Sequence, residues 1–164
     1  MTSTANERAV AIRAPEPRDY ARIAELAAQL GYKSDASEIG RRLAGMKGSA
    51  EHAVFVAETA EGDVAGWIGV FVWRGLESEA RVEISGLVVD EKARSLGIGR
   101  RLLERAEEWA REKGCATIGL RSNVIRERAH AFYERLGYEH VKTQKAFRKT
   151  FTGTVSISAR KNIS

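Results

Sequence analysis

The chain has 164 residues, 43% of them hydrophobic, and its 27 basic and 22 acidic side chains give a formal net charge of +5. This length and apolar content suit one domain with a buried core, and no apolar run approaches the roughly 18 residues of a membrane span. The single cysteine, Cys115, excludes an internal disulfide and a cysteine-based zinc site. Residues 1–8 lack the apolar stretch of a signal peptide, so we expect a cytoplasmic protein without a membrane partner.

The positive charge is spread along the chain, where basic and acidic residues alternate. Nucleic-acid surfaces usually show a basic stripe interleaved with aromatic residues, and no such stripe is visible. The charge therefore favours a local patch for an anionic cofactor. We expect no nucleic-acid partner and no bound metal.

The first half of the chain predicts a short strand, two helices and three further strands. Residues 9–13 form the first strand, which two prolines end. Apolar residues recur at helical spacing over 18–30, with Gly31 at the end, and a second helix follows that Asp35 or Ser37 caps. The three strand-like runs cover residues 52–58, 64–73 and 81–89.

The second half predicts a long helix over 97–113 with a strand after it at 115–120. A strand, a helix and a strand in this order make a βαβ unit with parallel strands and a right-handed crossover. A helix at 126–136 follows, and then an antiparallel hairpin of residues 138–140 and 141–151. Together these elements predict one domain over 8–151, between a disordered terminus at 1–7 and a flexible Ser/Thr-rich tail at 152–164.

An apolar strand, a Gly-containing turn and a helix follow one another over residues 88–102. Helix N-termini present unpaired N–H groups and a partial positive charge, and Gly97 and Gly99 let the main chain approach an oxyanion closely. Three arginines, at 94, 100 and 101, add charge. The turn therefore predicts a phosphate or pyrophosphate site. Leu102 stands where a dinucleotide fingerprint needs its third glycine, and the Walker spacing is absent.

Residues 94–99, Arg-Ser-Leu-Gly-Ile-Gly, resemble the Arg/Gln-x-x-Gly-x-Gly/Ala signature of the GNAT superfamily of N-acetyltransferases. In that family the turn holds the pyrophosphate of acetyl-coenzyme A. The predicted order of elements over 8–151 is similar to the family fold, an α/β fold of the α+β type with three α-β-α layers and a central mixed, splayed sheet. Asn123, Ala129 and Tyr133 resemble the second cofactor-binding segment. Asn123 precedes Ala129 by six residues instead of three, which leaves the role of Asn123 open.

The resemblance implies that pantetheine lies between two splayed strands and bonds to the main chain of one of them. Gly86 suits the β-bulge that such splaying requires, although it is equally readable as a plain strand glycine. The amide N–H of Val89 is the implied donor to the oxyanion of the reaction. The implied cofactor-binding residues are Leu87, Val88, Val89, Arg94, Ser95, Leu96, Gly97, Ile98, Gly99, Arg100, Asn123, Ala129 and Phe132.

Acetyl transfer to an amine needs a base, because a primary amine with a pKa of roughly 8 to 10.4 is mostly protonated at pH 7. Glu83 is the candidate base; the alternative is an ion-pair partner for Arg81 or Arg121. Tyr133 is the candidate general acid for the leaving thiolate; the alternative is a core tyrosine. The acceptor would contact Glu83, Trp73 and Tyr32. Tyr32 lies in the link between two predicted helices, and the alternative is that this link only ends one helix before the next begins.

The resemblance implies an acetyl-coenzyme A dependent N-acetyltransferase that acts by direct transfer in a ternary complex. The expected acceptor is a primary amine of a small molecule, such as an aminoglycoside-like compound or a polyamine. Two alternatives stay open, a protein or peptide acceptor and a non-catalytic domain that binds acyl-coenzyme A. Family habit also implies a homodimer.

Overall fold

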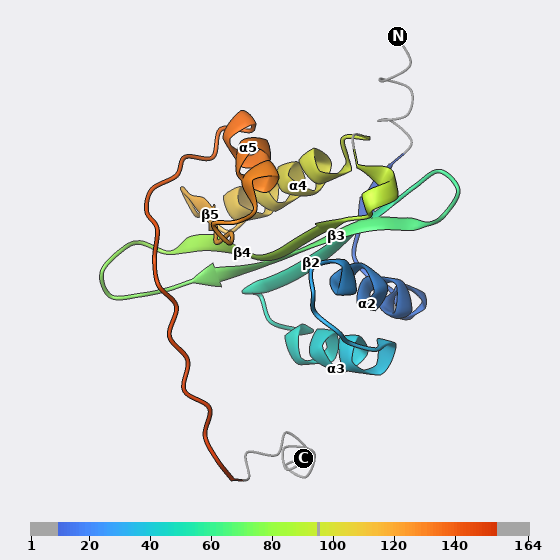
Figure 1. Cartoon of the computed structure of the whole chain (residues 1–164), viewed down its shortest axis with the longest axis horizontal. Coiled ribbons are helices and arrows are strands. Elements are labelled where there is room, and N and C mark those ends of the chain that lie inside the picture. The colour runs from blue at the N-terminus through green and yellow to red at the C-terminus, as the bar shows by residue number, and fades with distance from the viewer. Residues whose placement is uncertain (1–9, 95, 154–164) are drawn as a thin grey trace.

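The computed structural model describes residues 10–94 and 96–153, and its centre is a five-stranded sheet (Figure 1). Strands follow their sequence order across the sheet, the first four antiparallel and the last parallel to its neighbour. They are β1 (Ala11–Arg13), β2 (His52–Glu58), β3 (Val64–Trp73), β4 (Arg81–Val89) and β5 (Ile118–Leu120).

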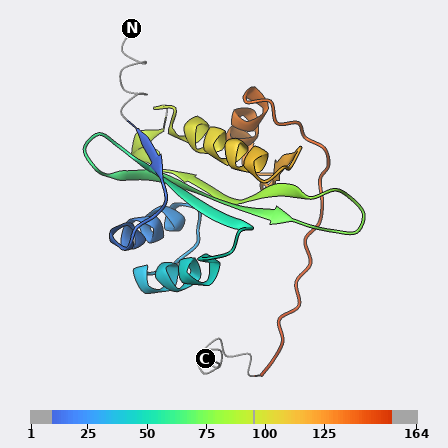
Figure 2. The same ribbon diagram turned by 180° about the vertical axis from the view of Figure 1, so that it is seen from behind.

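Helices cover both faces of the sheet. Figures 1 and 2 show α2 and α3 on one face and α4 and α5 on the other. Two short 3-10 helices, η1 (Pro17–Asp19) and η2 (Glu91–Ala93), precede α2 and α4. The α-helices of the described residues are α2 (Tyr20–Gln29), α3 (Ala36–Met46), α4 (Ile98–Glu112) and α5 (Glu127–Arg135). The predicted three-layer α-β-α arrangement with a mixed sheet is confirmed.

Each face of the sheet has its own core. On the α4 face, Ile68 and Val82 pack with the α4 side chains Leu102 and Ala106, which recur at helical spacing. On the α2 face, the cluster is formed by Ile23, Ala24, Leu26, Ile39, Val56, Val64 and Val88. Because β4 contributes to both clusters, its two faces are fixed by packing.

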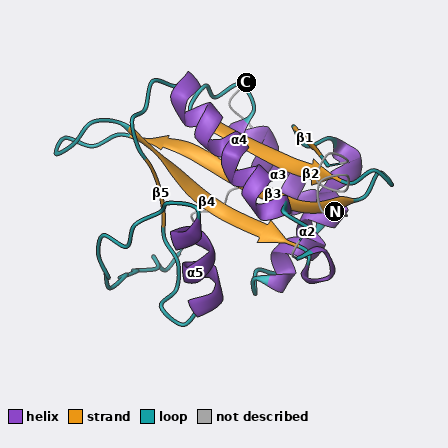
Figure 3. Ribbon diagram, turned by 90° about the horizontal axis from the view of Figure 1, so that it is seen from above, coloured by secondary structure: helices purple, strands orange, loops and turns teal. Residues whose placement is uncertain are grey.

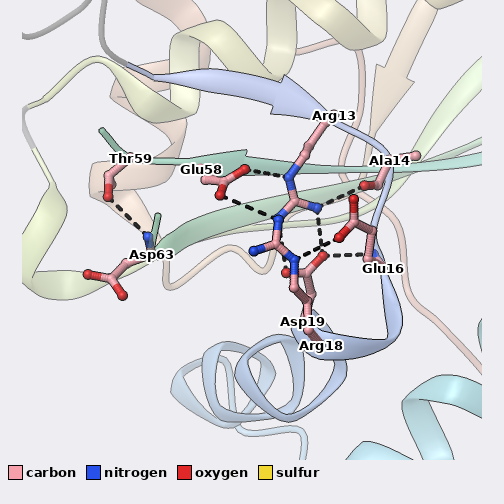
Figure 4. Close-up of polar contacts among 8 residues, drawn as sticks. All are labelled: Arg13, Ala14, Glu16, Arg18, Asp19, Glu58, Thr59 and Asp63. Atoms are coloured by element: carbon pink, nitrogen blue, oxygen red, sulfur yellow. Dashed lines mark hydrogen bonds and ion pairs between the residues drawn. The ribbon is translucent and has the colours of Figure 1, made fainter. Parts of the chain in front are cut away.

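Arg13 ties the first strand to the beginning of α2 (Figure 4). Its Nη1 lies 2.7 Å from Asp19 Oδ2, and its Nε lies 2.6 Å from Glu58 Oε2. Asp19 is only 4% exposed and also accepts the main-chain N–H of Glu16. The hydrogen bond from Arg13 holds the pKa of Asp19 below its usual value, against the opposing effect of burial. Asp19 therefore stabilises the fold only while it is ionised.

The predicted C-terminal hairpin at 138–140 and 141–151 is wrong. No strand follows β5 in the described residues, and the chain past α5 runs away from the body of the domain (Figures 1 and 2). Val141, Phe147 and Phe151 are exposed. Tyr138 still packs against the core and donates to Glu107 of α4 at 3.0 Å, but residues 139–151 are exposed. Strand-like alternation gives a strand only where a partner strand and a buried face are available, and these residues have neither.

The strand predicted at 115–120 begins later, at Ile118, for a local reason. Gly114 adopts a left-handed φ of 74°, and the N–H of Cys115 donates to the carbonyl of Ala110. The main chain at Cys115 therefore still closes the end of α4 and cannot pair with β4. The terminus predicted at 1–7 and residues 154–164 of the tail predicted at 152–164 lie outside the described residues. No helix of the described part is long and apolar enough to cross a membrane.

Candidate active site

A β-bulge interrupts β4 at the position predicted from Gly86. Gly86 pairs with Gly69 of β3 and Ile84 pairs with Val70, so Ser85 is the extra residue. A Cβ on Gly86 would lie 2.9 Å from the ring of Trp67, so this position has no room for a side chain. Pairing of β4 with β5 covers only three residues and ends at Ile84, directly before the bulge. In Figure 3, β5 lies beside the first part of β4 and the chain then leaves toward α5.

The main chain of β4 past the bulge faces the edge that β5 has left. The N–H of Asp90 donates to the carbonyl of Ala65 on β3 at 2.8 Å. Main-chain groups of successive residues in an antiparallel strand alternate in direction, so Val88 also faces β3. Leu87 and Val89 therefore direct their N–H and C=O groups to the opposite edge. An extended amide chain could add to that edge as a strand does.

The turn between β4 and α4 ends at the predicted glycines. Gly97 is the N-cap of α4 and has a φ of 74°, a left-handed conformation that favours glycine. A Cβ on Gly99 would lie 3.0 Å from the ring of Phe132, so α5 packs closely against this helix terminus. Ile98 is buried in the core, so only its main chain is available to a ligand. Ser95 lies outside the described residues.

Two arginines of the turn, Arg94 and Arg100, are exposed. Arg100 Nε donates to Glu104 Oε1 at 2.9 Å on the same helix. Leu96 is also exposed. The region therefore presents exposed positive charge around a fixed helix N-terminus, an arrangement suited to an anion.

Sequence reasoning missed a network that fixes the beginning of this turn. The Asp90 carboxylate accepts hydrogen bonds from Arg22 Nη2 at 2.5 Å, Gln29 Nε2 at 3.3 Å and the N–H of Lys92 at 3.2 Å. Gln29 Oε1 in turn accepts the N–H of Glu91. Burial opposes ionisation of Asp90, but these hydrogen bonds outweigh it and lower its pKa. Arg22 and Gln29 lie more than 60 residues before Asp90 in the chain, so no local pattern signals them.

Glu83 meets Arg81, one of the two partners that the sequence proposed. Arg81 Nε donates to Glu83 Oε1 at 2.7 Å, and the guanidinium lies 3.8 Å from the ring centroid of Trp73. Glu83 is opposite Phe71 of β3 and Gly119 of β5 in the sheet register. A Cβ on Gly119 would touch both carboxylate oxygens at 3.7 Å. Glycine thus leaves open the space in front of this carboxylate.

Tyr133 lies on α5 between two aromatic neighbours. Its ring centroid is 5.4 Å from that of Phe132 and 5.9 Å from that of Tyr138. Burial raises the pKa of Tyr133 above its usual value, and the charge of Arg126 opposes this only in part. The phenol is therefore protonated at neutral pH, as a proton donor must be. The half-buried Ala129 lies one helical turn earlier on α5.

Asn123 closes the turn that begins α5. Its Oδ1 accepts the N–H of Ile125 at 3.2 Å, and its carbonyl accepts from the N–H of Arg126 and from His130 Nε2. The side chain is thus engaged locally. The adjacent Ser122 Oγ is buried and has no hydrogen-bond partner among the described residues.

Tyr32 is the third side chain predicted to contact the acceptor. It is 69% exposed in the loop between α2 and α3. Arg126 Nη2 donates to the carbonyl of Leu30 in this loop at 3.4 Å, which joins the loop to the start of α5. No group of His, Cys, Asp and Glu side chains in residues 10–94 and 96–153 is arranged to hold a metal ion.

Comparison with known proteins gives a consistent match. The family model described as the acetyltransferase (GNAT) family matches residues 19–138. Aminoglycoside N(6')-acetyltransferase type 1 of Stenotrophomonas maltophilia is 32% identical over 141 residues, which cover 84% of this chain and 91% of that protein. Aminoalkylphosphonate N-acetyltransferase of Salmonella typhimurium is 39% identical over 88 residues, 52% of this chain and 57% of that protein.

Solved structures share the fold. Glucosamine-6-phosphate N-acetyltransferase from Arabidopsis thaliana superposes with a TM-score of 0.75 at 23% identity, covering 85% of this chain and 97% of that one. An aminoglycoside antibiotic 6'-N-acetyltransferase from Acinetobacter baumannii superposes with a TM-score of 0.74 at 16% identity, covering 87% and 99%.

Proposed function

We propose that this chain, which belongs to the acetyltransferase (GNAT) family, transfers an acetyl group from acetyl-coenzyme A directly to a primary amine of a small molecule in a ternary complex. The observation that carries the proposal is the departure of β5 from β4 at Ile84. It leaves main-chain groups of β4 at an open edge that leads to the N-terminus of α4. A long ligand with amides at one end and a pyrophosphate at the other fits such an edge.

Two parts of the chain would hold the cofactor. The N–H groups at the start of α4, with Arg94 and Arg100 near them, would bind the pyrophosphate. Leu87 and Val89 would bond to the pantetheine amides through their main chain. The left-handed Gly97 and the crowded Gly99 support this assignment, because both keep side chains out of the turn.

The residues beside that edge would carry out proton transfer. Glu83 would accept the proton of the acceptor ammonium, which frees the nitrogen lone pair. The N–H of Val89 would donate to the oxygen that becomes negatively charged as the nitrogen–carbon bond forms. Tyr133 would donate its proton to the thiolate as the carbon–sulfur bond breaks. Its raised pKa keeps the phenol protonated at neutral pH, so the proton is present for this step.

The acceptor is proposed to be small. The 32% identical relative is named for an aminoglycoside, and the second relative for aminoalkylphosphonates, so both classes belong in the first panel of acceptors. Thiol release from acetyl-coenzyme A should be measured with aminoglycosides, polyamines, amino acids, aminoalkylphosphonates and short peptides. Turnover with a small amine supports the proposal. If only the peptides are acetylated, the peptide alternative replaces the proposal. If none of these acceptors causes thiol release, both are contradicted.

The resemblance that led us to this function also leads us to propose a cytoplasmic homodimer. Light scattering of the purified chain tests the oligomeric state. A mass of two chains supports the dimer, and a mass of one chain at micromolar concentration contradicts it.

A further inference from the structure

We propose that the acceptor amine carries an acidic group, a carboxylate or a phosphonate, a few bonds from its nitrogen, and that Arg81 binds this group while Glu83 takes the proton of the amine. This inference rests on the proposed function and narrows its substrate class. It makes Arg81 the residue that determines specificity.

Arg81 is held in place but keeps donors for a ligand. Its Nε is engaged by Glu83, and its only other recorded hydrogen bond is a long one, 3.4 Å from Nη1 to Ser78 Oγ. Nη2 has no recorded partner among the described residues. The side chain is 29% exposed, against 14% for Glu83. A ligand therefore reaches the guanidinium more readily than the carboxylate beneath it.

The contacts of Arg81 orient its guanidinium in advance. Stacking on Trp73 fixes the plane, and the bond to Glu83 fixes the rotation within that plane. An oriented guanidinium presents two parallel N–H groups, which match the two oxygens of a carboxylate or phosphonate. Because the side chain is already ordered, a ligand would lose less entropy in binding to it.

The charges on this part of the sheet also match such a ligand. Strands β3, β4 and β5 contain only two charged side chains, Arg81 and Glu83. The register places both on the face that carries Phe71 and Trp73, next to the β5 residue Gly119. Beside the Ser85 hydroxyl and the His52 ring, which stacks on Phe71, the rest of this surface is apolar or glycine. One positive and one negative group there complement an amine with an attached acid.

A polycationic acceptor fits this surface poorly. Its second amine would meet the positive charge of Arg81 beside the only carboxylate on these three strands. Further acidic contacts would have to come from Glu77 and Glu79, which are both exposed in the loop before β4. Charges exposed in this way are screened by salt and add little.

The reaction balances without change to the acid group. The new bond joins the amine nitrogen to the acetyl carbon, and the bond from that carbon to sulfur breaks. The acceptor ammonium gives one proton to Glu83, whose Oε2 has no hydrogen bond in the described part of the chain, and the nitrogen loses its second proton to water once the new bond has formed. The thiolate receives the proton of Tyr133, and the phenolate that remains takes a proton back from water. The acid group stays ionised on Arg81 throughout and orients the nitrogen toward Glu83.

Matched acceptors test the inference on the wild-type enzyme. Each pair differs in the acid group alone: 2-aminoethylphosphonate against ethanolamine, and α-amino acids against their amides. We expect kcat/KM to be about 10- to 100-fold higher for the acidic member of at least one pair, the range for a charge-assisted, two-pronged contact. The pair that shows the larger ratio identifies the acid as phosphonate or carboxylate.

Variants of Arg81 locate the effect. Arg81→Gln should raise KM for the acidic acceptors and bring the ratio within each pair close to one, while Arg81→Lys should restore only part of it. A purely structural role would lower the activity toward both members equally. Arg74→Gln is the control, because Arg74 is an exposed arginine nearby that pairs with Glu51; it should leave the ratio unchanged.

Two results would overturn the inference in distinguishable ways. If polyamines, aminoglycosides or uncharged amines are acetylated at least as efficiently as the acidic members, the substrate class is wrong while the proposed function stands. If no amine releases thiol from acetyl-coenzyme A, the proposed function fails and the inference fails with it.

Discussion

The two halves of the candidate site are built from different parts of the chain. The cofactor half consists mainly of main-chain groups: the open edge of β4, a left-handed glycine and a helix N-terminus. The acceptor half consists of side chains: Glu83, Arg81 and Trp73, set on the opposite face of β4 from α4. Main-chain groups recognise a ligand common to a whole family, whereas side chains can change from one substrate to the next. The following variants separate these two halves.

The largest effect is expected in the acceptor half. Glu83→Gln should lower kcat at pH 7 by roughly 10²–10⁴, because the variant cannot accept the amine proton. Activity should recover in part at high pH, where more of the amine is already neutral. A pH–rate profile of both proteins is the measurement. Full activity of the variant at pH 7 would reduce Glu83 to an ion-pair partner of Arg81.

The Tyr133→Phe variant tests the step at which the two halves of the site meet, because the phenol would donate its proton to the sulfur of the cofactor. The variant keeps the ring contacts with Phe132 and Tyr138 and loses only the hydroxyl group that carries the proton. We expect kcat to fall by about 10² with nearly unchanged affinity for acetyl-coenzyme A. Single-turnover kinetics and calorimetry separate the two quantities. An unchanged rate of the chemical step would leave Tyr133 a packing residue.

A smaller effect is expected when a methyl group is added to a glycine of the cofactor half. Gly97→Ala should weaken acetyl-coenzyme A binding about tenfold, because it disturbs the N–H groups of the turn. Gly48→Ala is a matched control: Gly48 also has a left-handed φ, 84°, and an added Cβ there would meet nothing within 4 Å. Both variants should lose about 1–2 kcal/mol of stability. If calorimetry shows that Gly97→Ala and the wild-type chain bind acetyl-coenzyme A with equal affinity, the pyrophosphate does not bind at this turn.

The smallest effect on activity is expected outside both halves, at Asp19. Because its pKa is lowered in the folded chain, its ionised form stabilises the fold above the ordinary pKa near 4, and this contribution disappears as the pH falls through the folded value. Asp19→Asn should therefore cost about 1–3 kcal/mol at pH 7 and less at pH 3, below the ordinary pKa of the carboxyl. Denaturant unfolding at both pH values measures this. Asp63→Asn, in an exposed turn, serves as the control, and an equal loss at both pH values would contradict the account.

Sequence reasoning could propose the cofactor half because its signals are local. The glycines of the turn and the apolar stripe of α4 each follow from a few adjacent residues. Gly86 alone is equally readable as a plain strand glycine, and the register of β3 and β4 is needed to place the extra residue at Ser85. The same reasoning placed Glu83 near the site and left open whether it pairs with Arg81 or Arg121. Only the register of β3 and β4, which sets Arg81 against Trp73, resolves that choice.

Long-range features escaped the sequence. The network of Asp90 with Arg22 and Gln29 joins residues whose proximity depends on how α2 packs on the sheet. The hairpin predicted at 138–151 failed for a related reason. Alternation of apolar residues records a tendency to pair, but only the tertiary structure decides whether a partner strand is present.

Hydrogen exchange of three adjacent amides tests the central claim most directly, that the open edge of β4 is the acetyl-coenzyme A slot. In the free protein, the N–H groups of Leu87 and Val89 face the open edge and should exchange faster than that of Val88, which faces β3. Saturating acetyl-coenzyme A should slow exchange at Leu87 and Val89 and leave Val88 nearly unchanged. Protection elsewhere, with Leu87 and Val89 still exchanging at their free rates, would contradict the claim.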